Sequence, residues 1–143
     1  MVKLTTRMII EVAGFPKEHV EEVMKKVVEK IKQEQKVLSD VVHEAKELKE
    51  MWGSFVELEI TFKDLNHFTD FCFEYMPSSI DVLEPENFSF TSLDLSNLYN
   101  DLMGNIHRYD MLLKNFKATN TILRRQLDDK EKKEEVSKSE ENI

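Results

Sequence analysis

A histidine and two carboxylates in the middle of the chain could bind a divalent metal ion. His67, Asp70 and Glu74 are spaced so that a helix over this stretch would place all three on one side. One imidazole and two carboxylates suit a divalent ion, although the solvated face of a helix is built from the same residue types. The other histidines lie on other predicted elements, so no two histidines have metal-ligand spacing. We therefore predict no metal site and keep this triplet as the candidate to check.

Other groups that could perform chemistry are few. Glu57 and Glu59 could act as an acid and a base if a partner buried them, but surface acidity explains them equally well. The glycines Gly14, Gly53 and Gly104 are too scattered to form a phosphate-binding loop, and no local signature indicates a Ser-His-Asp arrangement. We therefore predict a protein that is not an enzyme and uses no cofactor.

The composition is that of an acidic folded protein. The chain has 143 residues, 34% of them charged, and a formal net charge of -8. This charge argues against nucleic-acid and anionic-membrane partners, because each phosphate contact needs a cation. The apolar runs are shorter than the roughly 20 residues that span a bilayer. Cys72 is the only cysteine, so no internal disulfide forms, and we expect a cytoplasmic location.

Alternating and helical patterns of apolar residues organise the first 88 residues. Core-facing apolar residues alternate with outward-facing residues along 4–13 and 55–62, as in strands that bury one face, and two shorter stretches also read as strands. In two other stretches apolar residues recur every three or four positions, which is typical of one-sided helices. Asp64 is placed to cap the second helix, and Pro77 ends it. The predicted order is strand 4–13, helix 17–35, strand 36–46, strand 55–62, helix 65–76 and strand 79–83, with a polar turn at 47–51.

This order defines an α+β fold class. Two βαβ-like halves joined by a hairpin form the ferredoxin-like split βαβ fold (βαββαβ), a four-stranded antiparallel sheet with two helices on one face. The strand over 36–46 has polar residues on both sides, so we expect it at a sheet edge. The sheet face without helices should then carry Ile9, Glu11, Phe55, Glu57, Glu59, Asp81 and Leu83.

A long helix with a coiled-coil pattern should follow over residues 91–127. Apolar or aromatic residues recur at alternating spacings of four and three, as in the a and d positions of a heptad repeat. At about 1.5 Å per residue this helix would be roughly 50 Å long, more than the small domain can cover. We therefore expect part of the stripe to pair with another chain. The predicted interface consists of Leu102, Ile106, Tyr109, Leu113, Phe116, Asn120 and Leu123.

Asn120 is the one polar residue of this stripe, at an a position. A buried asparagine at that position bonds best to its own copy in a parallel partner, so a parallel dimer is favoured. Two observations keep alternatives open. Tyrosines and Phe116 at core positions also suit an antiparallel pair or a four-helix arrangement. Leu98 and Leu112 widen the first half of the stripe, as expected if that half packs on its own domain.

After residue 127 the chain consists almost entirely of charged and polar residues without apolar periodicity. We expect a disordered charged tail over residues 128–143. The predicted organisation is therefore an α+β domain at 1–88, a heptad helix at 91–127 and the tail.

Two short segments are similar to parts of known domain families. The segment Ala13, Gly14, Phe15 and Pro16 lies where ACT-type regulatory domains, which share this order of strands and helices, bind amino acids between subunits. The resemblance concerns the architecture of residues 4–84 and implies a ligand site at Gly14, Phe15 and Pro16. A second segment, Trp52 to Leu58, is similar to the central strand of RNA-recognition domains, but glycine replaces a stacking aromatic and the neighbours are acidic.

These observations predict a non-enzymatic, homo-oligomeric protein-interaction module. It would dimerise through the heptad helix and present its α+β domain to another protein. The alternative is an ACT-like regulatory domain that senses a small ligand in a pocket at a subunit or domain interface.

Overall fold

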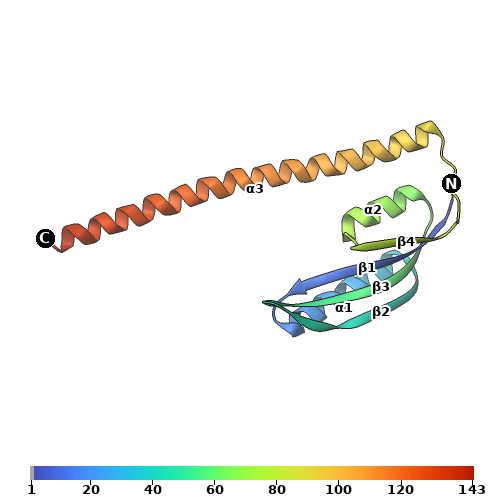
Figure 1. Ribbon diagram of the computed structural model, residues 1–143, viewed down its shortest axis with the longest axis horizontal. Helices are drawn as coiled ribbons and strands as arrows, with labels where there is room; N and C mark the ends of the chain where they lie inside the picture. The colour runs from blue at the N-terminus through green and yellow to red at the C-terminus, as the bar shows by residue number, and fades with distance from the viewer. Residues whose placement is uncertain (1) are drawn as a thin grey trace. The chain divides into compact units, whose positions relative to one another are not determined.

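The structure, a computed structural model, describes residues 2–143, so Met1 of the expected first domain lies outside it. The chain divides into two units, of which the first ends at Phe90 and the second begins at Thr91. The first unit is the predicted ferredoxin-like α+β fold (Figure 1). Its antiparallel sheet has the strand order β2-β3-β1-β4. The elements are β1 (Leu4–Gly14), α1 (Lys17–Glu34), β2 (Lys36–Leu48), β3 (Met51–Phe62), α2 (Leu65–Tyr75) and β4 (Ser79–Glu84).

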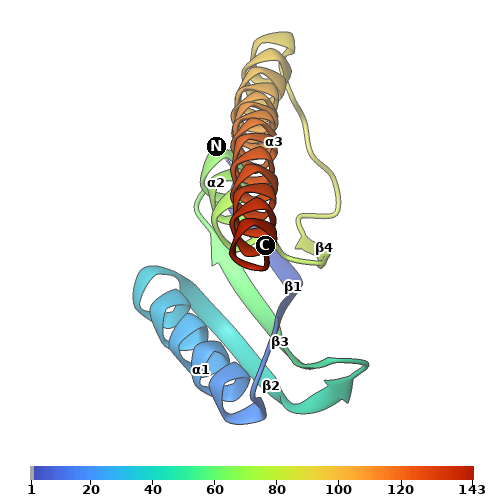
Figure 2. The same ribbon diagram turned by 90° about the vertical axis from the view of Figure 1, so that its left-hand side faces the viewer.

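The core lies between one face of the sheet and the two helices. Alternate residues of β1 and β3 are fully buried on this face, because successive side chains of a strand point to opposite sides. The buried residues of α1 follow the three-and-four spacing that its sequence predicts, and α2 contributes Phe71. Figure 2 shows α1 along the sheet of this unit. The cluster contains Leu4, Met8, Ile10, Met24, Val28, Ile31, Val56, Leu58, Ile60, Phe62 and Phe71.

The hairpin between β2 and β3 is longer than the sequence pattern indicated. We expected a turn over residues 47–51, but Leu48 pairs with Met51, which leaves only Lys49 and Glu50 as the connection. The register of β2 shifts between Val37 and Ser39 and again between His43 and Lys46. Such bulges interrupt the alternation of faces along a strand. The alternation of apolar residues along β2 therefore stops before the strand ends, although the backbone stays paired as far as Leu48.

Helix α2 begins and ends as its sequence predicts. The Asp64 carboxylate accepts a hydrogen bond from the backbone N–H of His67 at 2.8 Å, as an N-cap residue does. Met76 ends the helix in the left-handed conformation, with φ of 49°. Pro77 follows and cannot continue the helical hydrogen bonding.

The second unit is a single helix, α3 (Ser92–Glu141). Thr91 and Asp94 form a reciprocal capping box at its start. The expected disordered tail over residues 128–143 is wrong, because the helix continues to Glu141. Lysine and glutamate make up most of this segment and have high intrinsic helix propensity, so charged residues sustain a helix that buries nothing. Loss of apolar periodicity marked the end of the apolar stripe, and the backbone helix extended further.

Among the helices of residues 2–143, none combines the length and apolar character that crossing a membrane requires.

Candidate functional site

Helix α3 carries a continuous apolar stripe that we call the seam. The seam comprises the a and d positions Leu95, Tyr99, Leu102, Ile106, Tyr109, Leu113, Phe116, Asn120, Leu123 and Leu127. All ten lie within one uninterrupted helix, so they share one side of it along its length. The structure describes every residue of α3 and none of them is buried. Tyr99, Phe116 and Leu127 have exposed fractions of 60%, 69% and 60%.

Exposure of this many large apolar side chains is costly in water. Covering one leucine, isoleucine or phenylalanine contributes about 1.5–3 kcal/mol relative to leaving it exposed. The seam side chains are spread along the helix and none reaches full burial within the chain. A contiguous apolar surface of this extent is typical of an interface with another molecule.

Polar side chains on α3 make local contacts beside the seam. The Asn120 side-chain oxygen accepts a hydrogen bond from Arg124 Nε at 3.0 Å. Lys114 lies one helical turn after Asp110 and forms an ion pair with it, in which Lys114 Nζ is 2.7 Å from Asp110 Oδ2. These contacts connect residues four apart on an exposed helix and individually contribute only a few tenths of a kcal/mol, about 0.2–0.5. They leave the seam itself without cover.

The structure does not assemble the metal candidate. Glu74 forms an ion pair with Lys30 of α1 at 3.2 Å, and the His67 ring packs edge-on against Phe62 with centroids 5.5 Å apart. Asp70 is exposed on α2. Within residues 2–143, no group of three histidine, cysteine or carboxylate side chains is arranged to hold a metal ion.

The two candidate carboxylates on the open sheet face each have a partner. Glu59 accepts a hydrogen bond from Arg7 at 2.8 Å, and this hydrogen bond raises the pKa of the Arg7 guanidinium. His43 Nε2 lies 3.1 Å from Glu57 Oε2. The His43 ring also stacks on the ring of Phe55, with centroids 4.1 Å apart. The face is thus a network of cross-strand pairs. Sequence reasoning missed His43 and Arg7, because their positions depend on the β2 bulges and on pairing between distant strands.

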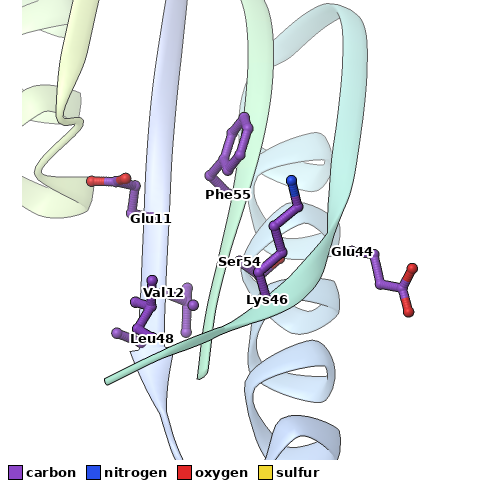
Figure 3. A pocket seen from close by; sticks show the side chains of 9 residues that line it. Glu11, Val12, Glu44, Lys46, Leu48, Ser54 and Phe55 are labelled. Atoms are coloured by element: carbon purple, nitrogen blue, oxygen red, sulfur yellow. The ribbon is translucent and has the colours of Figure 1, made fainter. Parts of the chain in front are cut away.

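A shallow hollow of about 270 Å³ opens near the β2–β3 hairpin (Figure 3). It lies around Gly53, which has no side chain, and Ala13, the partner of Gly53 on β1. A Cβ atom on Gly53 would lie 2.6 Å from Leu48 Cδ1, so the Leu48 side chain covers this glycine. In Figure 3 the Lys46 ammonium points toward Phe55, while the Glu44 carboxylate points away.

The predicted ligand residues lie beside this hollow and do not line it. Gly14 pairs with Trp52, one residue before Gly53, and Pro16 precedes α1. Phe15 is exposed by 72%, in the turn between β1 and α1. Gly14, Phe15 and Pro16 therefore lie at the same end of the sheet as the hollow, and the hollow itself depends on the small residues at Gly53 and Ala13.

The thiol of Cys72 should react slowly. Cys72 is half-buried on α2, and this burial raises the pKa of its thiol from 9.0 to about 11. The thiolate is the reactive form, and a pKa higher by two lowers its fraction at pH 8 about 100-fold. We expect labelling by a disulfide reagent at pH 8 to be at least roughly tenfold slower in the folded protein than in denaturant. Equal rates would show that the thiol is freely accessible.

The fold and the seam together define a class of protein: a ferredoxin-like α+β unit joined to a long helix with an exposed heptad stripe. The MJ0538 family model matches residues 5–143, which include both units, and the chain therefore belongs to the MJ0538 family. No curated protein and no solved structure matches the chain.

Proposed function

We propose that this protein is a non-enzymatic, homo-oligomeric interaction module that dimerises through the seam of α3. The observation that carries the proposal is a 50-residue helix in which no residue is buried and whose heptad stripe is exposed, apart from the half-buried Leu102. Helices in proteins gain most of their stability from packing of an apolar face. Pairing of two seams would provide that packing.

A second copy is the partner that fits this stripe best. A two-fold symmetric dimer uses the same surface on both chains, and a heptad stripe packs against another heptad stripe by inserting side chains into matching holes. The stripe spans Leu95 to Leu127, or more than four heptads, which is long enough for a stable two-stranded coil. Asn120 is the one residue of the seam that is neither apolar nor aromatic, so pairing would bury few polar groups besides its amide and the two tyrosine hydroxyls.

The paired helices would hold two α+β units that can present their surfaces to another protein. The formal net charge of -8 supports a protein partner over nucleic acid or an anionic membrane. The single cysteine is consistent with a reducing, cytoplasmic location, which we include in the proposal.

Light scattering coupled to size-exclusion chromatography tests the proposal on the full chain. We expect twice the mass of one chain at tens of micromolar, with dissociation on dilution and a melting temperature of α3 that rises with protein concentration. A single-chain mass at tens of micromolar would overturn the proposal.

The hollow favours a second candidate function, binding of a small ligand by the α+β unit. Its volume of about 270 Å³ lies just below the usual range for ligand pockets, and Phe55 and Leu48 give it apolar walls. A thermal-shift screen with amino acids and nucleotides tests this function. Stabilisation by one ligand class, lost in a Gly53→Val variant that fills the hollow, would support it; no shift with any compound would oppose it.

A further inference from the structure

We infer that two copies of this chain pair through α3 in antiparallel orientation, with Leu113 of one chain opposite Phe116 of the partner subunit. This inference rests on the proposed self-association and adds the orientation and register of the two helices. Side-chain size along the seam, the hydrogen bond of Asn120 and the flanking charges carry it.

The sizes of the seam residues match in this orientation. A parallel pair places every seam residue opposite its own copy, which sets Phe116 against Phe116 and Tyr109 against Tyr109. In an antiparallel pair a positions face d positions, so large side chains meet smaller ones and fill the space between the helices more evenly. The layers are Leu102 with Leu127, Ile106 with Leu123, Tyr109 with Asn120, and Leu113 with Phe116, each occurring twice by symmetry.

Asn120 does not require its own copy as a partner. A buried asparagine amide at an a position favours a parallel dimer, because it bonds best to the same residue across the interface. In the structure Asn120 Oδ1 already accepts a hydrogen bond from Arg124 on its own helix, with the two atoms 3.0 Å apart. The antiparallel register places this amide opposite the phenol of the partner's Tyr109, which is also a polar group. The polar residue therefore suits both orientations.

The charges beside the seam favour the antiparallel orientation. In a parallel pair each g residue faces the e residue of the next heptad, which sets Asn105 against Asp110, Leu112 against Lys117 and Thr119 against Arg124. No pair of opposite charges results. In the antiparallel register e positions face e positions, and Asp110 lies opposite the partner's Lys117 at two symmetric places.

The same charges select the register. Shifting the antiparallel pair so that Leu95 faces Leu127 would cover the seam but would place Asp110 against its own copy. Two like charges at the centre of the pair repel each other. In the single chain Asp110 contacts Lys114 at 2.7 Å, and the two side chains are 47% and 68% exposed. That exposed contact can be exchanged for one with the partner's Lys117 at little cost.

Charge reversal at the two positions tests the inference in the full chain. We expect Asp110→Lys and Lys117→Asp, each alone, to weaken self-association about tenfold, because both symmetric pairs become repulsive. Mixing the two variants should produce a heterodimer tighter than either homodimer, since every facing pair is then of opposite charge. In a parallel dimer the two residues do not face each other, and mixing would have no effect, which would overturn the inference.

Crosslinking provides a second readout that does not depend on affinity. In a Cys72→Ser background, one chain carries Asn105→Cys and another carries Gln126→Cys, and a short bis-maleimide joins thiols that lie close together. We expect crosslinks between the two different chains and none between two Gln126→Cys chains, which lie roughly 30 Å apart in the antiparallel pair. Gln126→Cys chains crosslinked to each other would establish a parallel dimer.

The two failures can be told apart by the mass of the unchanged protein. A monomer in light scattering would defeat the proposed self-association and the orientation with it. A dimer that crosslinks like to like would defeat only the orientation. Far-UV circular dichroism of each variant confirms that α3 stays helical, so that lost association is not lost folding.

Discussion

The Leu113→Glu variant should be a monomer at concentrations where the unchanged chain is a dimer. Leu113 occupies a central a position and is 56% exposed in the single chain. In a paired seam both copies would be buried, and each contributes about 1.5–3 kcal/mol by leaving water. Glutamate loses this contribution and also places a carboxylate in an apolar interface. The expected weakening is at least about 100-fold in the dissociation constant.

Met111→Glu is the matched control for this change. Met111 lies two residues away on the same helix, is 46% exposed and points outward at an f position of the heptad. The substitution adds the same charge with the same helix propensity but should leave the dimer intact. Sedimentation velocity of both variants across a concentration series measures the difference. Equal dissociation of both variants, or of neither, would contradict pairing through the seam.

Phe62→Ala should destabilise the α+β unit by about 3–5 kcal/mol, the usual effect of emptying a core phenylalanine site. Phe62 is the last residue of β3 and is fully buried. Its ring lies 5.3 Å from that of Phe68 and 5.2 Å from that of Phe71, measured between centroids. These contacts attach α2 to the sheet. The variant removes packing from both elements and leaves a cavity between them.

Tryptophan fluorescence during chemical denaturation measures this loss in the correct unit. Trp52 is the only tryptophan and lies on β3, so its signal follows the α+β unit and not α3. Protein concentration is held constant, because dimerisation would shift the midpoint by mass action. Phe15→Ala serves as the control, since Phe15 is 72% exposed and its removal should change the unfolding free energy little. A loss below 1 kcal/mol for Phe62→Ala would contradict the core assignment. If that variant does not fold, Phe62→Leu should show a smaller loss of the same sign.

The order of elements could be predicted because burial of one face makes apolar residues recur at a regular spacing in the sequence. Leu58 and Ile60 of β3 alternate with polar residues, and Met8 and Ile10 of β1 are flanked by Arg7 and Glu11, because the helices cover only one sheet face. The N-cap at Asp64 was readable for a similar reason, since capping depends on residues close in sequence.

Features that depend on distant pairing could not be predicted. The hollow lies where Gly53 pairs with both Ala13 and Lys46, next to the point where the register of β2 shifts between His43 and Lys46. The stack of His43 on Phe55 also depends on pairing between strands, because the two residues are direct partners on β2 and β3. The seam was visible as a heptad repeat, but a repeat describes one surface and does not name its partner. The helical tail was missed because apolar residues recur at helical spacing only where one face of a helix is buried. A helix that is solvated on all sides has no such pattern in its sequence.

The length of α3 would turn an antiparallel dimer into a spacer with a defined reach. Each α+β unit is joined to the N-terminal end of its helix, so the two units would be carried at opposite ends of the pair. At 1.5 Å per residue the two helix starts would be roughly 70 Å apart. A partner that displays two binding sites at that spacing would be held by both units at once, and its apparent affinity would exceed that of either contact alone. A partner with a single site, or with sites much closer together, would gain nothing from the second unit.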